Sequence, residues 1–195
     1  MRLANISLSK KIFAAFAILV VVSATMGGAV YSRLSAIDDT VADNRSTNLT
    51  LRSALTARLF LSRQENALRG LILTQEPRRE TSIATFRDRF NESIELIAQT
   101  EAHDAGVMQN IDAIRPNFLA WHEEIVQPAI LLARDPATLS QAQDLIFSDR
   151  AGTLGDPVEE AIDAIIASSV ASSEQNSALQ EASTSASEMA LMIGI

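Results

Sequence analysis

Residues 12–30, IFAAFAILVVVSATMGGAV, carry no charged side chain, and this stretch constrains the chain more than any other feature. A helix of this length rises roughly 28 Å, about the thickness of the hydrocarbon core of a bilayer. Basic Lys10 precedes the stretch and acidic Asp38 follows it. The apolar run is longer than that of a cleaved signal peptide. We therefore predict a transmembrane helix over 12–31, with residues 1–11 in the cytoplasm and the body on the other side.

The chain closes on a second apolar segment, MALMIGI, at residues 189–195. We expect these residues to be the start of a second transmembrane helix that is truncated. The alternative is an apolar helix end that packs on the body. The body then comprises residues 32–188.

Composition excludes several classes of function. The chain has no Cys, so disulfides and thiolate chemistry are excluded. It carries 24 Asp and Glu against 16 Lys and Arg, a net charge of −8, which disfavours contact with phosphate backbones. No nucleophile elbow, phosphate loop or metalloprotease motif is present. We expect no nucleic-acid partner, no cofactor, no metal and no enzymatic activity.

Apolar periodicity and turn residues predict an all-α body. The first helix is expected over 34–74, with a buried seam at steps of three and four, and it continues the membrane helix. The second is expected over 78–101, after the turn at Pro77. The seam residues of the first helix are Leu34, Ile37, Val41, Asn48, Leu51 and Leu55.

The second half of the body is expected to hold a longer helix and two further ones. The third helix is predicted over 105–134, kinked or split by its two prolines, with Asp104 as its N-cap. A short helix follows over 136–148, then a loop, SDRAGTLG, and a last helix that starts at Pro157 and heads for the second apolar segment. Because the connections are short, neighbouring helices should be antiparallel. The expected fold is an up-down four-helix bundle whose long first and last helices continue into transmembrane helices.

Charged residues appear at the distal end of the first helix, where its seam turns polar. Arg58, Glu65 and Arg69 share one broad helical face, and Glu65 and Arg69 have the i, i+4 spacing of an ion pair. Burying a charge is costly unless it is paired and hydrogen-bonded. Two interpretations stay open: the pair locks the fold across to another helix, or it lines a polar pocket for a ligand.

Two other side chains were candidates for binding. His122 is followed by two glutamates, but adjacent helical residues point in different directions, so a metal site is not expected. We interpret it as a surface histidine beside two acids. Trp121 is expected at a helix–helix contact.

The segment Glu65-x-x-x-Arg69-Gly70-x-x-Leu73-Thr74 resembles the E-x-x-x-R-G-Y-x-L-T-G-D signature of CHASE-type and other four-helix-bundle sensor modules. These are periplasmic input domains of methyl-accepting chemotaxis proteins and related bacterial receptors. The N-terminal stretch NISLSKKI also resembles the start of such receptors. Leu71 replaces the usual aromatic residue of the signature, and Gln75-Glu76 replace its Gly-Asp turn.

The resemblance implies the sensory input region of a transmembrane chemoreceptor in the bacterial inner membrane, with its body in the periplasm. It implies a homodimer in contact with membrane lipid, sensing a small molecule or a periplasmic binding protein. A kinase and its adaptor would be engaged only through a C-terminal domain that is not in this chain. The alternatives are the input module of a membrane histidine kinase or nucleotide cyclase, and a membrane-anchored structural bundle without a ligand.

Overall fold

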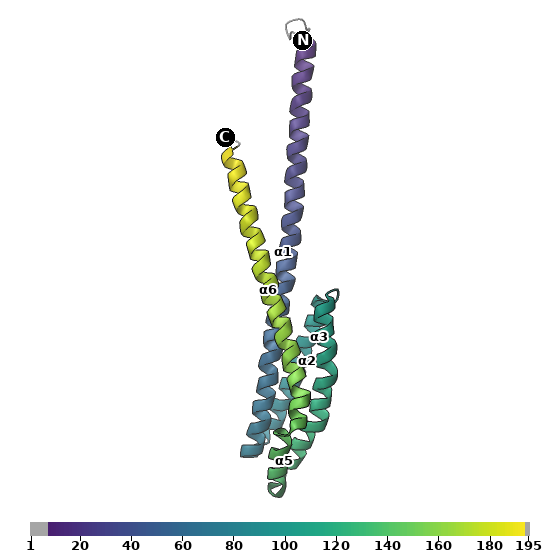
Figure 1. Ribbon diagram of the computed structural model, residues 1–195, viewed down its shortest axis with the longest axis vertical. Helices are drawn as coiled ribbons and strands as arrows, with labels where there is room; N and C mark the ends of the chain where they lie inside the picture. The colour runs from purple at the N-terminus through teal and green to yellow at the C-terminus, as the bar shows by residue number, and fades with distance from the viewer. Residues whose placement is uncertain (1–7, 194–195) are drawn as a thin grey trace. The chain divides into compact units, whose positions relative to one another are not determined.

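A computed structural model describes residues 8–193, although some side chains before residue 43 and after residue 182 lie outside the description. Every element in this range is helical, which confirms the all-α class. The elements are α1 (Leu8–Thr74), α2 (Arg78–Thr100), α3 (Ala105–Trp121), the π-helix η2 (His122–Val126), α4 (Gln127–Ala133), the 3-10 helix η3 (Pro136–Thr138), α5 (Leu139–Ile146) and α6 (Asp149–Ile193) (Figure 1).

The chain divides into two compact units, Met1–Asp43 and Asn44–Ile195, which we call unit 1 and unit 2. In unit 1, the first part of α1 exposes large apolar side chains around the helix. In the part of the chain that the structure describes, none of the helices combines the length and the apolar character that a membrane span requires. Within the expected membrane helix, the side chains at 14, 15, 29 and 30 lie outside the description, as do those at 189–195. The exposed apolar residues are Ile12, Phe13, Phe16, Ile18, Leu19, Val20, Val21, Val22 and Met26.

In unit 2, the contacts between neighbouring helices show that these helices run in opposite directions. Thr50 of α1 donates a hydrogen bond to Glu101, just after α2, while Phe60 stacks on Phe86 nearer the α1–α2 turn. Likewise, Arg115 of α3 bonds to Glu95 of α2 at 2.9 Å, while Phe118, later in α3, stacks on Phe90, earlier in α2. α3 also packs along α6 (Figure 1). The core between these helices is apolar, and its largest buried side chains include Phe90, Ile83, Ile97, Ile111, Ile114, Ile125, Ile162 and Ile165.

The buried face of α1 differs from the predicted seam. Val41 and Leu55 are 59% and 50% exposed, and Asn48 is also exposed, so the seam is wrong at these positions. Leu34 and Ile37 have side chains outside the description. Small residues occupy much of the true buried face, where their size permits close approach of the neighbouring helices. The buried residues of α1 are Thr50, Ser53, Ala54, Ala57, Leu61, Gln64, Ala67, Leu68, Leu71 and Ile72.

Two boundaries in the second half also differ from expectation. The helix expected over 105–134 is interrupted by η2. There the N–H of Gln127 donates to the carbonyl of His122, five residues earlier, whereas an α-helical N–H bonds to the carbonyl four residues earlier. This wide turn comes just before Pro128, which has no N–H to donate, whereas Pro116 stays inside α3. The predicted loop SDRAGTLG is wrong, because α6 begins at Asp149 and continues through Pro157.

The connection between α1 and α2 was predicted at the correct place. Gln75 has a φ of 52°, and its N–H donates to the carbonyl of Leu71 at 2.7 Å, which ends α1 in a left-handed cap. α2 then starts at Arg78, directly after Pro77. Beside the turn, the guanidinium of Arg79 covers Gly70 and bonds to Thr74 and Glu76. The side chain of Arg79 therefore occupies the space that a Cβ on Gly70 would need.

Replacing Gln75 by glycine should stabilise the fold. A left-handed conformation costs a residue with a Cβ roughly 1 kcal/mol, and glycine adopts it without that cost. The variant loses a 3.4 Å bond from Gln75 Nε2 to the carbonyl of Ala133, which is long and weak. We expect Gln75→Gly to raise the free energy of unfolding by about 0.5 kcal/mol in urea titrations.

The matched control is Gln109→Gly, in the interior of α3 and exposed. There a glycine should lower the free energy of unfolding by about 1 kcal/mol. Equal losses in both variants would contradict the account of the turn.

Candidate functional site

Arg58 connects the first and last helices of unit 2. Its Nη1 lies 2.8 Å from Oε2 of Glu159, and its Nε lies 3.4 Å from Oδ1 of Asp163. Both acids belong to α6 and are four residues apart, so they lie on one face of that helix. The guanidinium of Arg58 therefore joins α1 to α6 through two carboxylates.

Glu65 and Arg69 lie about two and about three turns further along α1. Arg69 Nη2 is 3.5 Å from Oε2 of Glu65, the ion-pair arrangement that the spacing predicts. The Glu65 side chain is 24% exposed and that of Arg69 is 51% exposed. Only the acid is partly buried, so the pair is asymmetric. Whether it locks the fold or contacts a ligand stays a prediction.

A pocket of about 230 Å³ opens beside this pair. We call it the α1–α6 pocket, since these two helices supply most of its polar groups. Trp121 and Ile125 form an apolar wall, and carboxylates from α1 and α6 face the same space. Its lining residues are Glu65, Leu68, Arg69, Trp121, Ile125, Ile146, Ala151, Gly152, Gly155, Asp156 and Glu159.

The electrostatics of the α1–α6 pocket centre on Glu65. Burial raises the pKa of Glu65 above its ordinary value of 4.5, and the carboxylate of Glu159 raises it further. Arg69 and Arg58 act in the opposite direction without cancelling this rise, and Asp156 adds to it. The pocket thus holds a carboxylate whose negative charge is incompletely compensated, a common feature of functional sites.

The first turns of α6 form the other side of the pocket. Gly152 and Gly155 are poor helix formers, and Pro157 lacks the N–H that would bond to the preceding turn. Trp121 and Glu124 provide the compensating contacts. The indole Nε1 of Trp121 lies 3.9 Å from where a Cβ of Gly155 would be, and Arg150 donates two 2.8 Å hydrogen bonds to Glu124. These turns are helical because of tertiary contacts.

The stability of a Glu65→Gln variant should depend on pH relative to the native chain. The raised pKa means that Glu65 contributes stability fully below its unfolded-state pKa and loses that contribution as pH rises through the folded-state pKa. Glutamine does not titrate. We therefore expect the variant to gain stability relative to the native chain between about pH 4 and about pH 7, measured as urea midpoints.

Glu124→Gln provides a control of opposite sign. Hydrogen bonds from Arg150 hold the pKa of Glu124 below its ordinary value. Its contribution to stability is therefore present above the unfolded-state pKa and is lost as pH falls through the folded-state pKa. The Glu124→Gln variant should lose stability near neutral pH, and this loss should shrink in acid. Parallel trends in the two variants would contradict the assignment of Glu65.

His122 is not the surface residue that we expected. It is 7% exposed, because the wide turn of η2 directs it, Ile125 and Val126 inward together. Trp121 is 6% exposed and its indole lies against Gly155 of α6, so its expected place at a helix contact is confirmed. Within the described part of the chain, no three His, Asp or Glu side chains are grouped to hold a metal ion.

Sequence reasoning identified the α1 side of the pocket and missed the rest. Asp156 and Glu159 were not singled out from the sequence as candidate site residues, and the two glycines lie in the segment that was predicted to be a loop. Nothing local in the sequence links them to Glu65, which is some ninety residues earlier along the chain. The spacing of Glu159 and Asp163 could have indicated this side of the site. Acids four residues apart lie on one face of a helix, where both can pair with one arginine, here Arg58, on a neighbouring helix.

A comparison with protein families places this geometry in context. A family model described as the CHASE3 domain matches residues 30–179, which include Arg58, Glu65, Arg69 and the whole α1–α6 pocket. No curated protein matches the chain, and no solved structure does.

Proposed function

The chain belongs to the CHASE3 domain family, whose members are periplasmic sensor domains of chemoreceptors and histidine kinases, and from this premise we propose that it is the sensory input region of a transmembrane chemoreceptor. The stimulus in this proposal is a small molecule that binds in the α1–α6 pocket. The observation that carries the proposal is the position of that pocket, inside the matched residues 30–179 and between the first and last helices of unit 2.

The proposed architecture is an up-down four-helix bundle made of the unit 2 part of α1 with α2, α3 and α6. It is supported by the opposite running directions of the contacts between α1 and α2 and between α2 and α3. The proposal also attaches the bundle to the bacterial inner membrane through residues 12–31. Exposed apolar side chains surround α1 in unit 1, and a helix that is apolar all round needs an apolar environment.

Signalling would proceed by a shift of α6 relative to α1. A ligand can move such an equilibrium only by its difference in affinity for the two arrangements. The α1–α6 pocket offers that difference, because Glu65 and Arg69 belong to α1 whereas Gly152, Asp156 and the rest of the first turns belong to α6. Those turns have weak intrinsic helicity, so a ligand against them changes their stability readily.

Glu65 and Arg69 would then contact the ligand, and Arg58 would couple the two helices through Glu159 and Asp163. The proposed protein is a homodimer without enzymatic activity or cofactor, and its output passes through α6 to a kinase and adaptor. Because CHASE3 domains also occur in histidine kinases, an input module of a kinase is the second candidate. A nucleotide cyclase input module and a structural bundle without a ligand are further alternatives.

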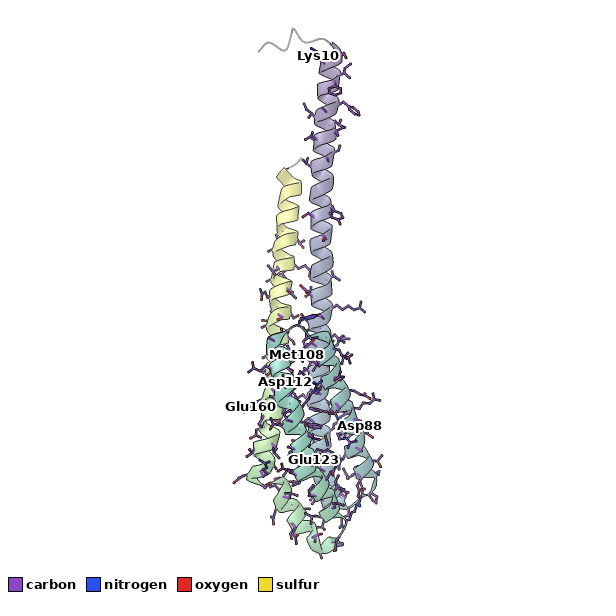
Figure 2. All side chains as sticks on the ribbon, turned by 90° about the vertical axis from the view of Figure 1, so that its right-hand side faces the viewer. Lys10, Asp88, Met108, Asp112, Glu123 and Glu160 are labelled. Carbon is purple, nitrogen blue, oxygen red and sulfur yellow. The ribbon has the colours of Figure 1, made fainter. Side chains whose placement is uncertain are left out.

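Spin labels test the proposed movement, since the chain has no cysteine of its own. Labels are attached to Thr56→Cys on α1 and Glu160→Cys on α6, both exposed positions (Figure 2 labels Glu160). The full chain is first screened for thermal stabilisation by amines, amino acids and organic acids, in the native and Glu65→Gln forms. A compound that requires Glu65 for its effect should also change the distance between the labels.

The control pair, Glu160→Cys with Ala171→Cys, lies within α6 and should keep its distance. Stabilisation that depends on Glu65 without any change between α1 and α6 would favour a structural bundle over a receptor. If no compound of the panel stabilises the native chain more than the Glu65→Gln form, direct sensing in this pocket is wrong.

A further inference from the structure

A second pocket, of about 340 Å³, lies between α2 and the α3–η2 segment. It shares no lining residue with the α1–α6 pocket. Figure 2 shows Asp88 and Glu123, two of its lining residues, on neighbouring helical segments. Phe90 and Phe118 line it as well, and their rings stack at 4.0 Å between centroids. We call it the α2–α3 pocket.

His122 lines this pocket, and its ring nitrogens are not among the buried atoms that lack a partner in the described part of the chain, so they are open to the pocket. The residue is 7% exposed, and no hydrogen bond joins its ring to another residue that the structure describes. Burial lowers the pKa of His122 below 6.5, and Arg87 lowers it further against the opposing effects of Glu123 and Asp88. The ring is therefore neutral at pH 7, with one nitrogen available as an acceptor.

The charge around the α2–α3 pocket that is left after ion pairing is negative. Arg87 donates two hydrogen bonds to Asp88, and Arg115 donates one to Glu95, so both cations have carboxylate partners. Within the described residues, Glu123 has no basic group within 4.0 Å. A ligand that complements this pocket supplies a positive charge, a donor for His122 and an apolar body for the aromatic floor.

We propose that the α2–α3 pocket binds a small organic ammonium ion with an apolar body. The ammonium group pairs with Glu123 and donates a hydrogen bond to His122, while the apolar body packs against Phe118 and Leu119. A nearby cation over an aromatic face adds further attraction. The π-helical turn η2 supports this assignment, because such turns often occur at functional sites, and here it places His122 and Glu123 consecutively at the pocket. The proposal does not depend on the sensing role of the α1–α6 pocket.

Three probes of similar shape test the charge that the pocket selects. The full chain in detergent is titrated by calorimetry with benzylamine, benzyl alcohol and benzoate at pH 7. Benzylamine should bind at least about fivefold more tightly than the other two, the equivalent of one partly exposed charge pair. Tighter binding of benzoate, or no measurable binding of benzylamine, overturns the proposal.

Matched variants locate the binding. Glu123→Gln should weaken benzylamine binding about fivefold, whereas Glu124→Gln, the adjacent residue outside the pocket, should leave it unchanged. Glu65→Gln should also leave it unchanged. A loss of binding on Glu65→Gln that Glu123→Gln does not share would assign the amine to the α1–α6 pocket and overturn the proposal.

The two histidines of the chain give an independent readout. On addition of benzylamine, the imidazole C–H proton signals of His122 should shift, while those of the exposed His103 should not. Equal shifts at both histidines, or a shift at neither, would overturn the role of His122 as the hydrogen-bond acceptor.

Discussion

Phe90→Ala should lower the free energy of unfolding by about 3–5 kcal/mol, the largest single effect we expect from this chain. The Phe90 side chain is 1% exposed, and its ring stacks on Phe118 of the neighbouring helix. Truncation removes buried apolar area and also leaves a cavity between α2 and α3 that rigid helices close only in part. Urea unfolding of the native and variant chains, followed by circular dichroism, measures the difference.

Phe147→Ala is the matched control, because Phe147 is 73% exposed at the end of α5. It should change the free energy of unfolding by less than about 0.5 kcal/mol. Phe90→Leu, which keeps most of the apolar volume, should fall between the two. A cost for Phe90→Ala no greater than that for Phe147→Ala would show that α2 and α3 do not pack as described.

Gln64→Met should have the second largest effect, a rise in the free energy of unfolding of about 1–3 kcal/mol. Gln64 lies on the buried face of α1 and is 0% exposed. Neither its Nε2 nor its Oε1 has a hydrogen-bond partner among the described residues. Methionine has a similar shape and no amide group, so the substitution removes the cost of burying two unsatisfied polar atoms while keeping the packing.

The exposed Gln141 of α5 provides the control, since Gln141→Met removes an amide that water already solvates. Its effect should stay within about 0.5 kcal/mol. Gln64→Leu should also stabilise the chain, though less if the shorter side chain leaves a void. A loss of stability in both Gln64 variants would mean that a buried water satisfies the amide.

The comparison of sequence and structure is clearest in α2. Its start after Pro77 and its buried residues Ile83, Phe90, Ile94 and Ile97 follow from the apolar spacing of its own segment. Asp104 caps α3 as predicted, and Asp135 caps η3 in the same way, because each carboxylate accepts a hydrogen bond from the backbone N–H two residues on. These features depend on residues within a few positions, so local rules suffice.

Two failures have a common cause in long-range packing. The first turns of α6 contain two glycines and a proline, a composition typical of a loop, yet contacts with Trp121 and Glu124 make them helical. In α1, Leu51 and Leu55 were assigned to the core by hydrophobicity, whereas Ala54 and Ala57 are the fully buried residues. Which face of α1 is buried depends on the size of the side chains on the neighbouring helices. The local sequence of α1 therefore cannot predict it.

The sequence by itself determined that this body is helical, where most of its turns lie, and that Glu65 and Arg69 can pair on one face of the first helix. Those properties depend on backbone propensity, caps and the helical repeat, all of which are local. Only the tertiary structure placed Asp156 and Glu159 beside Glu65 and turned His122 into the interior. Each of those arrangements requires segments far apart in the chain to meet, because burial and the pKa of a charged group are properties of what surrounds it.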